Sequence, residues 1–110
     1  LDPSGRIAQE MVLTGGKRVR ARLALATVEV LGGLAGAGNR QRGIPWAAAC
    51  EMLHHATLVH DDIQDGDRVR RDRPTAWAQH GVAQAINAGD LMLMLPSCYP
   101  SNSSIHKIWR

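Results

Sequence analysis

Residues 54–75, HHATLVHDDIQDGDRVRRDRPT, carry a dense cluster of charged side chains within the 110-residue chain. Three aspartates, Asp61, Asp62 and Asp65, fall within about one helical turn, and His54 precedes the first of them by seven residues. Helical spacing places Asp61 and Asp65 on one face, with Asp62 beside them and His54 pointing the same way. Because like charges at this spacing repel one another, we expect a ligand to compensate them.

The chemistry of these residues indicates what that ligand is. Mg²⁺ takes oxygen ligands, typically from one or two carboxylates, and bridges to substrate phosphates. Arg70 and Arg71 suit the same ligand, because a guanidinium offers a planar fork that matches phosphate oxygens. The stretch therefore predicts half of a metal–diphosphate site, although a solvated helix end is the alternative for an isolated D-D-x-x-D. A calcium loop from Asp61 is excluded, since Ile63 stands where an oxygen ligand is required.

A second motif, GGKRVR at residues 15–20, has the features of an anion site. A glycine pair before a helix lets a ligand approach the backbone, and the helix dipole favours an anion there. Lys17 and Arg20, three residues apart, would share one face of a helix and grip a diphosphate together. The alternative is a basic first turn that faces solvent.

Composition predicts an all-α protein. Hydrophobic residues make up 45% of the chain, and Phe is absent. The net charge of +3 is concentrated in basic clusters without interleaved aromatics, so a small phosphorylated ligand fits better than nucleic acid.

Cys50 and Cys98 form no metal-finger or redox spacing, which indicates a reduced, cytoplasmic setting. We find no signal peptide and no apolar run long enough for a transmembrane segment.

Apolar periodicity and helix-breaking residues predict the element boundaries. Pro45 suits the first position of the central helix, and Thr75 suits the cap of a later one. We expect a flexible connector over residues 35–43 and a charged loop over residues 66–73. We expect a short helix within residues 1–13, after a turn at residues 2–5. Further expected helices cover residues 17–31, 45–65, 76–80 and 82–95.

Four stretches together resemble the trans-isoprenyl diphosphate synthases of the polyprenyl synthetase family. Their amino-acid sequence is most similar to the geranylgeranyl type. They are GGKRVR (15–20), EMLHHATLVHDDIQD (51–65), RVRRDRPT (68–75) and INAGDLM (86–92). The resemblance implies the N-terminal portion of an all-α isoprenoid synthase bundle around a deep cavity. It also implies an Mg²⁺-dependent prenyltransferase that adds isopentenyl diphosphate to an allylic diphosphate, and a homodimer in the full-length parent.

The resemblance also implies a role for each matching residue. One group would hold Mg²⁺ and the allylic diphosphate: Asp61, Asp62, Asp65 and Arg70. A second group would bind isopentenyl diphosphate: Lys17, Arg20, His54 and Arg71. Chain length in the family depends on the two positions that Ala56 and Thr57 occupy here, and their small side chains predict a product of twenty carbons or longer.

Two departures from the family pattern are Ala21, where proline is usual, and Asp72, where glycine is usual. Residues 1–95 would form a partial domain carrying the first aspartate-rich motif, and residues 96–110 a non-homologous or disordered tail. Nothing after Leu95 resembles the family's second aspartate motif, so we expect a fragment that is inactive alone.

Two other functions stay open. A non-catalytic helical partner could bind diphosphate and pair with a complete synthase. An HD-type phosphohydrolase would use His60 and Asp61, but beyond them only His80 and His106 remain downstream as ligands. For His60 a packed or hydrogen-bonded role is the preferred interpretation.

Overall fold

The computed structural model describes residues 2–13, 16–31 and 38–98. Within these residues the chain is helical apart from one short hairpin, which confirms the predicted all-α class. The elements in chain order are α1 (Pro3–Leu13), α2 (Val19–Leu31), α3 (Gly38–Asp65), β1 (Val69–Arg70), β2 (Arg73–Pro74), α4 (Ala76–His80), α5 (Val82–Met94) and a short 3₁₀ helix, η1 (Leu95–Cys98).

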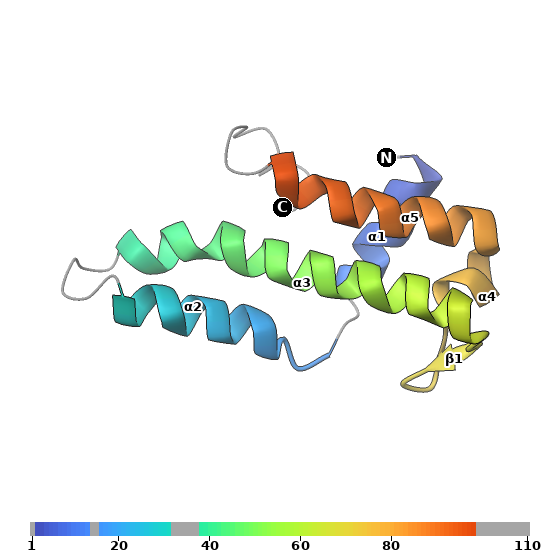
Figure 1. Cartoon of the computed structure of the whole chain (residues 1–110), viewed down its shortest axis with the longest axis horizontal. Coiled ribbons are helices and arrows are strands. Elements are labelled where there is room, and N and C mark those ends of the chain that lie inside the picture. The colour runs from blue at the N-terminus through green and yellow to red at the C-terminus, as the bar shows by residue number, and fades with distance from the viewer. Residues whose placement is uncertain (1, 14–15, 32–37, 99–110) are drawn as a thin grey trace.

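Helix α3 is the centre of the molecule. Figure 1 shows α2 along one side of it and α5 along the other, with α1 crossing near α3 and α5. The core lies between α1, α3, α4 and α5, and many of its members are alanines, which let helix axes approach closely. Its buried residues are Ile7, Ala8, Val12, Met52, Ala56, Val59, Ala76, Ala85, Ala88 and Met92.

Helices α3 and α5 meet at Gly89. A Cβ at this position would overlap the imidazole of His60, so only glycine permits the contact. The Nε2 of His60 lies 3.3 Å from the Ile86 carbonyl oxygen and 3.4 Å from Asp90 Oδ1. His60 therefore joins two helices, as expected for a hydrogen-bonded residue, and this use argues against a phosphohydrolase ligand.

The start of α3 differs from the sequence-based expectation. The helix begins at Gly38 and runs for 28 residues with Pro45 inside it, whereas we expected a connector over residues 35–43 and Pro45 at the first turn. Gly43 packs against Val28 of α2, with Val28 carbons 3.1 Å from where a Cβ would lie. Packing against α2 thus outweighs the single backbone donor that Pro45 removes. Residues 32–37 lie outside the described part.

The charged segment after α3 is held by local hydrogen bonds. Residues Val69–Arg70 and Arg73–Pro74 pair antiparallel within the expected loop. The Asp67 carbonyl accepts from Thr75 Oγ1 at 2.8 Å and from Trp77 Nε1 at 2.7 Å. Thr75 occupies the expected N-cap position of α4, yet its side chain makes no bond to the helix. This segment is therefore a fixed part of the structure.

Two further observations concern the chain as a whole. No helix in the described residues is both long and apolar enough to cross a membrane. Helix α5 ends at Met94, close to the expected stop before Pro96, and residues 95–98 continue as η1. The expected tail at residues 96–110 falls mostly outside the described part, so that assignment stays a prediction.

Candidate functional site

Four predicted ligand residues come together in one cavity. A cavity of about 480 Å³, here called the cationic cavity, is lined by Lys17, Arg20, His54 and Arg71. They come from three separate segments. Lys17 and Arg20 lie on either side of the start of α2, His54 lies in α3, and Arg71 lies in the turn of the hairpin. Its remaining lining residues are Gly16, Arg18, Val19, Glu51, His55 and Leu58.

The charge of the cationic cavity selects for anions. Lys17, Arg18, Arg20 and Arg71 contribute four permanent positive charges to its wall, against the single carboxylate of Glu51. A concave surface lined by one sign of charge concentrates the field and attracts counter-ions. Guanidinium groups in addition bind phosphate oxygens in pairs. The cavity therefore suits a phosphorylated ligand.

Glu51 is a site residue whose role the sequence analysis did not predict. It is 5% exposed, and its Oε1 accepts a hydrogen bond from the Ala21 backbone N–H at 2.9 Å. Its Oε2 lies 3.7 Å from His55 Nε2. Its only signal in the sequence is a carboxylate within a largely apolar helical stretch.

The start of α2 differs from the anion site predicted from the sequence. Helix α2 begins at Val19 rather than at Lys17, and Arg18 adopts a positive φ of 53° just before it. Lys17 and Arg20 therefore do not share a helical face, although both line the cavity. Glu51 occupies one backbone donor in the first turn of α2, so that N–H is not open to an anion.

Two neighbouring histidines of α3, His54 and His55, have lowered pKa values and therefore favour the neutral form. Burial lowers the pKa of His54, and nearby Arg20 lowers it further. Burial also lowers the pKa of His55, while Glu51 partly opposes this effect. A neutral imidazole can still donate one hydrogen bond to a phosphate oxygen. A bound dianion would favour the charged form and so tighten the contact.

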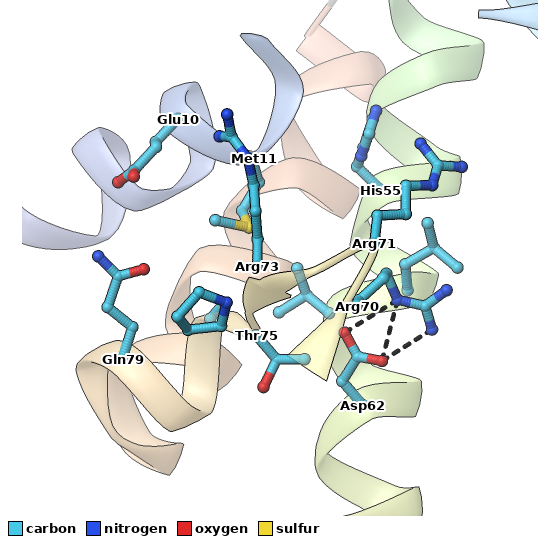
Figure 2. Close-up of a pocket in the computed structure, with 13 residues that line it drawn as sticks. Glu10, Met11, His55, Asp62, Arg70, Arg71, Arg73, Thr75 and Gln79 are labelled. Atoms are coloured by element: carbon cyan, nitrogen blue, oxygen red, sulfur yellow. Dashed lines mark hydrogen bonds and ion pairs between the residues drawn. The ribbon is translucent and has the colours of Figure 1, made fainter. Parts of the chain in front are cut away.

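The three predicted metal ligands, Asp61, Asp62 and Asp65, differ in burial and in contacts. Asp62 is 4% exposed and accepts three hydrogen bonds from Arg70, as Figure 2 shows. The distances are 3.1 Å and 3.2 Å from Nε to Oδ1 and Oδ2, and 2.7 Å from Nη2 to Oδ1. These bonds raise the pKa of Arg70. Asp61 and Asp65 are exposed.

Among the residues that the structure describes, no three histidine, cysteine or acidic side chains gather closely enough to hold a metal ion. Mg²⁺ in phosphate sites, however, takes only one or two protein carboxylates and completes its shell with water and phosphate oxygens. Asp61 and Asp65, one turn apart and exposed, fit that requirement. These two carboxylates therefore suit a metal ion that binds together with a phosphorylated ligand.

A second cavity, here called the hairpin cavity, has a volume of about 300 Å³ and lies between α1, α3, the hairpin and α4. Asp62 and Arg70 form part of its wall (Figure 2). It shares His55, Leu58 and Arg71 with the cationic cavity, so the two adjoin.

The two residues predicted to set chain length face different surroundings. Ala56 is fully buried in the core, whereas Thr57 is exposed and lines a groove of about 740 Å³ between α2 and α3. The other residues lining this groove are Arg20, Leu23, Ala24, Thr27, Cys50, Leu53 and His54. Arg20 and His54 also line the cationic cavity, so the groove runs on from it.

Comparison with known proteins agrees with this geometry. The family model described as polyprenyl synthetase matches residues 4–107. The chain belongs to the polyprenyl synthetase family. Among its curated relatives is a geranylgeranyl diphosphate synthase of Saccharolobus solfataricus, 44% identical over 78 residues, which cover 71% of the chain and 22% of the relative. A (2E,6E)-farnesyl diphosphate synthase of Mycobacterium bovis is 42% identical over 80 residues, with 73% and 21% covered.

A solved structure gives the same result for the fold. The geranylgeranyl pyrophosphate synthetase from the archaeon Geoglobus acetivorans superposes with a TM-score of 0.76 at 37% identity, covering 87% of this chain and 30% of that one. The chain thus has the helical fold of isoprenyl synthases. It spans about a fifth of the length of the two curated relatives.

Proposed function

We propose that this chain forms the isopentenyl-diphosphate half-site and the first metal-binding motif of a trans-prenyl diphosphate synthase. The observation that carries the proposal is the convergence of Lys17, Arg20, His54 and Arg71 on one cationic cavity. Exposed Asp61 and Asp65 lie further along α3, toward its C-terminal end. The family match and the names of the relatives support the substrate class.

In this proposal each diphosphate has its own set of side chains. Lys17, Arg20, His54 and Arg71 hold isopentenyl diphosphate in the cationic cavity. Asp61 and Asp65 hold Mg²⁺, and Arg70 contacts the diphosphate of the allylic substrate. When bound, Mg²⁺ neutralises charge that develops on the leaving diphosphate.

The residues of this chain would orient the two substrates and stabilise charge. As the allylic C–O bond breaks, its electron pair leaves with the diphosphate, and Arg70 stabilises the growing negative charge. The alkene of isopentenyl diphosphate then attacks the allylic carbocation, and loss of one proton gives the longer prenyl diphosphate. Confining both substrates removes most of the entropic cost of their encounter.

The groove beside Thr57 would receive the growing hydrocarbon. Its walls include Leu23, Ala24 and Leu53, which suit an apolar chain. The small Thr57 leaves the groove open, which supports a product of twenty carbons or longer.

A non-catalytic partner subunit is the second candidate. Helix α2 leaves Leu23, Val30 and Leu31 exposed, at 66%, 77% and 82%. Such side chains favour association with further protein. In this alternative the chain binds diphosphate and pairs with a complete synthase.

Two measurements test these proposals. Calorimetric titration of the chain with isopentenyl diphosphate should give binding that Arg20→Gln weakens by about tenfold, whereas the matched variant Arg6→Gln on α1 should bind as the parent does. Equal binding by both variants would contradict the half-site. Incorporation of labelled isopentenyl diphosphate by the chain alone, compared with incorporation after addition of a complete synthase, then separates the catalytic role from the partner role.

A further inference from the structure

His60 lies on the face of α3 that packs against α5, directly before the acidic end of the helix. It stands four residues after Ala56, which is fully buried, and three residues before Ile63, which packs against the core. Residues at this spacing share one helical face. Exposed Asp61 and Asp65 lie on another face of the same turns. The way in which His60 is seated on α5 therefore determines where these two carboxylates point.

The imidazole of His60 is held on α5 by shape and by hydrogen bonding. Its ring lies against the backbone of Gly89, where a Cβ would overlap it. Its Nε2 lies 3.3 Å from the Ile86 carbonyl oxygen and 3.4 Å from Asp90 Oδ1. Both oxygens accept hydrogen bonds, so the tautomer with a proton on Nε2 satisfies the contact. His60 thus contacts one turn of α5 at three of its residues.

The end of α3 needs support because its charges oppose the helix dipole. Carboxylates near a helix C-terminus are unfavourable, and the last five residues of α3 include Asp61 and Asp65. The backbone there ends in a Schellman motif: Gly66 has a φ of 70°, and the Asp67 N–H donates to the Asp62 carbonyl at 2.9 Å. These bonds are local to the chain end, so they do not set its position against α5.

We propose that His60 is a positioning residue for the acidic turn of α3, residues 61–65. Its imidazole, seated on Gly89, holds this turn in place before a metal–diphosphate ligand binds. The proposal rests on the proposed function, which assigns Mg²⁺ to the acidic turn. Preorganisation raises affinity, because a turn that is already in its bound arrangement loses less conformational freedom on binding. Gly89 contributes by admitting the ring, so its effect passes through His60.

The first test is calorimetric titration of the 110-residue chain with inorganic diphosphate in the presence of Mg²⁺. Gly89→Ala forces the imidazole to move and should weaken binding several-fold. The control Asn87→Ala, at an exposed position of the same helix, should bind as the parent does. Both variants place alanine in α5 and raise its helix propensity, so displacement of the imidazole is what distinguishes them. Parent-like affinity in Gly89→Ala would overturn the proposal.

Substitutions of His60 separate the hydrogen-bonded ring from the space that it fills. His60→Gln keeps a planar group with an N–H donor and should retain most of the affinity. His60→Leu is apolar and lacks the donor, so it should lose about as much affinity as Gly89→Ala. Parent-like binding by His60→Leu, or binding by His60→Gln that is no better than that of His60→Leu, would overturn the proposal.

A double variant tests whether Gly89 acts through His60. His60→Ala/Gly89→Ala removes the overlap, yet it should bind Mg²⁺-diphosphate no better and no worse than His60→Ala, because both changes act on one contact. Recovery to the parent affinity would mean that only the overlap matters. Multiplied losses would mean that Gly89 acts separately. Either result would overturn the positioning role of His60.

Amide hydrogen exchange without any ligand separates this proposal from the proposed function. In Gly89→Ala the backbone amides of residues 61–65 should exchange faster than in the parent, whereas those of α2, on the other side of α3 (Figure 1), should keep their rates. Unchanged exchange in the acidic turn would overturn the proposal. If exchange rises as expected but the parent chain does not bind Mg²⁺-diphosphate, the proposed function fails while the hold of His60 on the turn stands.

Discussion

The guanidinium of Arg71 lies against the backbone of Gly16, so closely that a Cβ at residue 16 would overlap it. The two residues belong to segments more than fifty positions apart, the hairpin turn and the region before α2. Their contact closes one side of the cationic cavity, which both residues line. A side chain at residue 16 would therefore force the guanidinium of Arg71 to move.

Gly16→Ala should displace Arg71 and weaken binding of isopentenyl diphosphate by about tenfold, the loss expected for one charge-assisted contact. Calorimetric titration measures this directly, with Asn87→Ala on the exposed face of α5 as a control that should bind normally. The double variant Gly16→Ala/Arg71→Ala should be no weaker than Arg71→Ala alone. If the two substitutions reduced the affinity independently, Gly16 would affect binding by a mechanism that does not involve Arg71.

Asp72→Gly should stabilise the protein. Residues 71 and 72 both have positive φ, which costs non-glycine residues free energy and which hairpin turns normally satisfy with glycine or asparagine. The free energy of unfolding should rise by about 0.5–1 kcal/mol, seen as a melting temperature a few degrees higher. Asp72→Ala removes the same charge without relieving the backbone, so a similar gain in that variant would contradict the explanation.

Glu51→Leu should destabilise the fold by about 1–2 kcal/mol, because the Ala21 N–H in the first turn of α2 loses its acceptor. Glu51→Gln keeps an oxygen at this position and should lose clearly less. Urea denaturation followed by circular dichroism compares the two. Equal losses would mean that the charge of Glu51, and not its hydrogen bond, is what matters.

Stability should fall with acidification below pH 6.5. Burial lowers the pKa of His54 and of His55 from the ordinary value of 6.5, so the unfolded chain takes up protons that the folded chain resists. The contribution is fully present above pH 6.5 and is lost as the pH falls toward the lowered folded values. Denaturation at pH 7.5 and at pH 5.5 measures it, and His55→Gln should reduce the difference. If the difference in stability between the two pH values were unchanged in His55→Gln, groups other than His55 would cause it.

Much of the fold follows from local sequence signals. Gly81 and Pro96 mark the ends of helical periodicity, and α4 and α5 begin and end close to where these signals place them. Helix α1 instead begins at Pro3, within the turn expected at residues 2–5. Pro45 misled the prediction of α3, because the helix runs through it and Gly43, just before it, packs against Val28 of α2. Tertiary contacts of this type leave no periodic signal in a single sequence.

The candidate site was predictable to the extent that it depends on residue type and spacing. The sequence indicated which residues carry charge, and four of them do meet in one cavity. It could not indicate that Asp62 turns toward Arg70, since that contact depends on how the hairpin folds back on α3. Nor could it indicate the bond between Glu51 and Ala21, which joins two helices thirty positions apart.

Helix α3 carries Glu51, His54, Asp61 and Asp65 on one continuous element. Seven residues of helix span about 10 Å, so the interval between His54 and Asp61 is fixed by backbone hydrogen bonds rather than by side-chain packing. One inserted or deleted residue would rotate everything beyond it by about 100° and turn Asp61 and Asp65 away from the face that His54 shares with them. Under the proposed function, the length of this stretch of α3 would therefore set the distance between the two diphosphates, whereas the side chains between its functional positions could change.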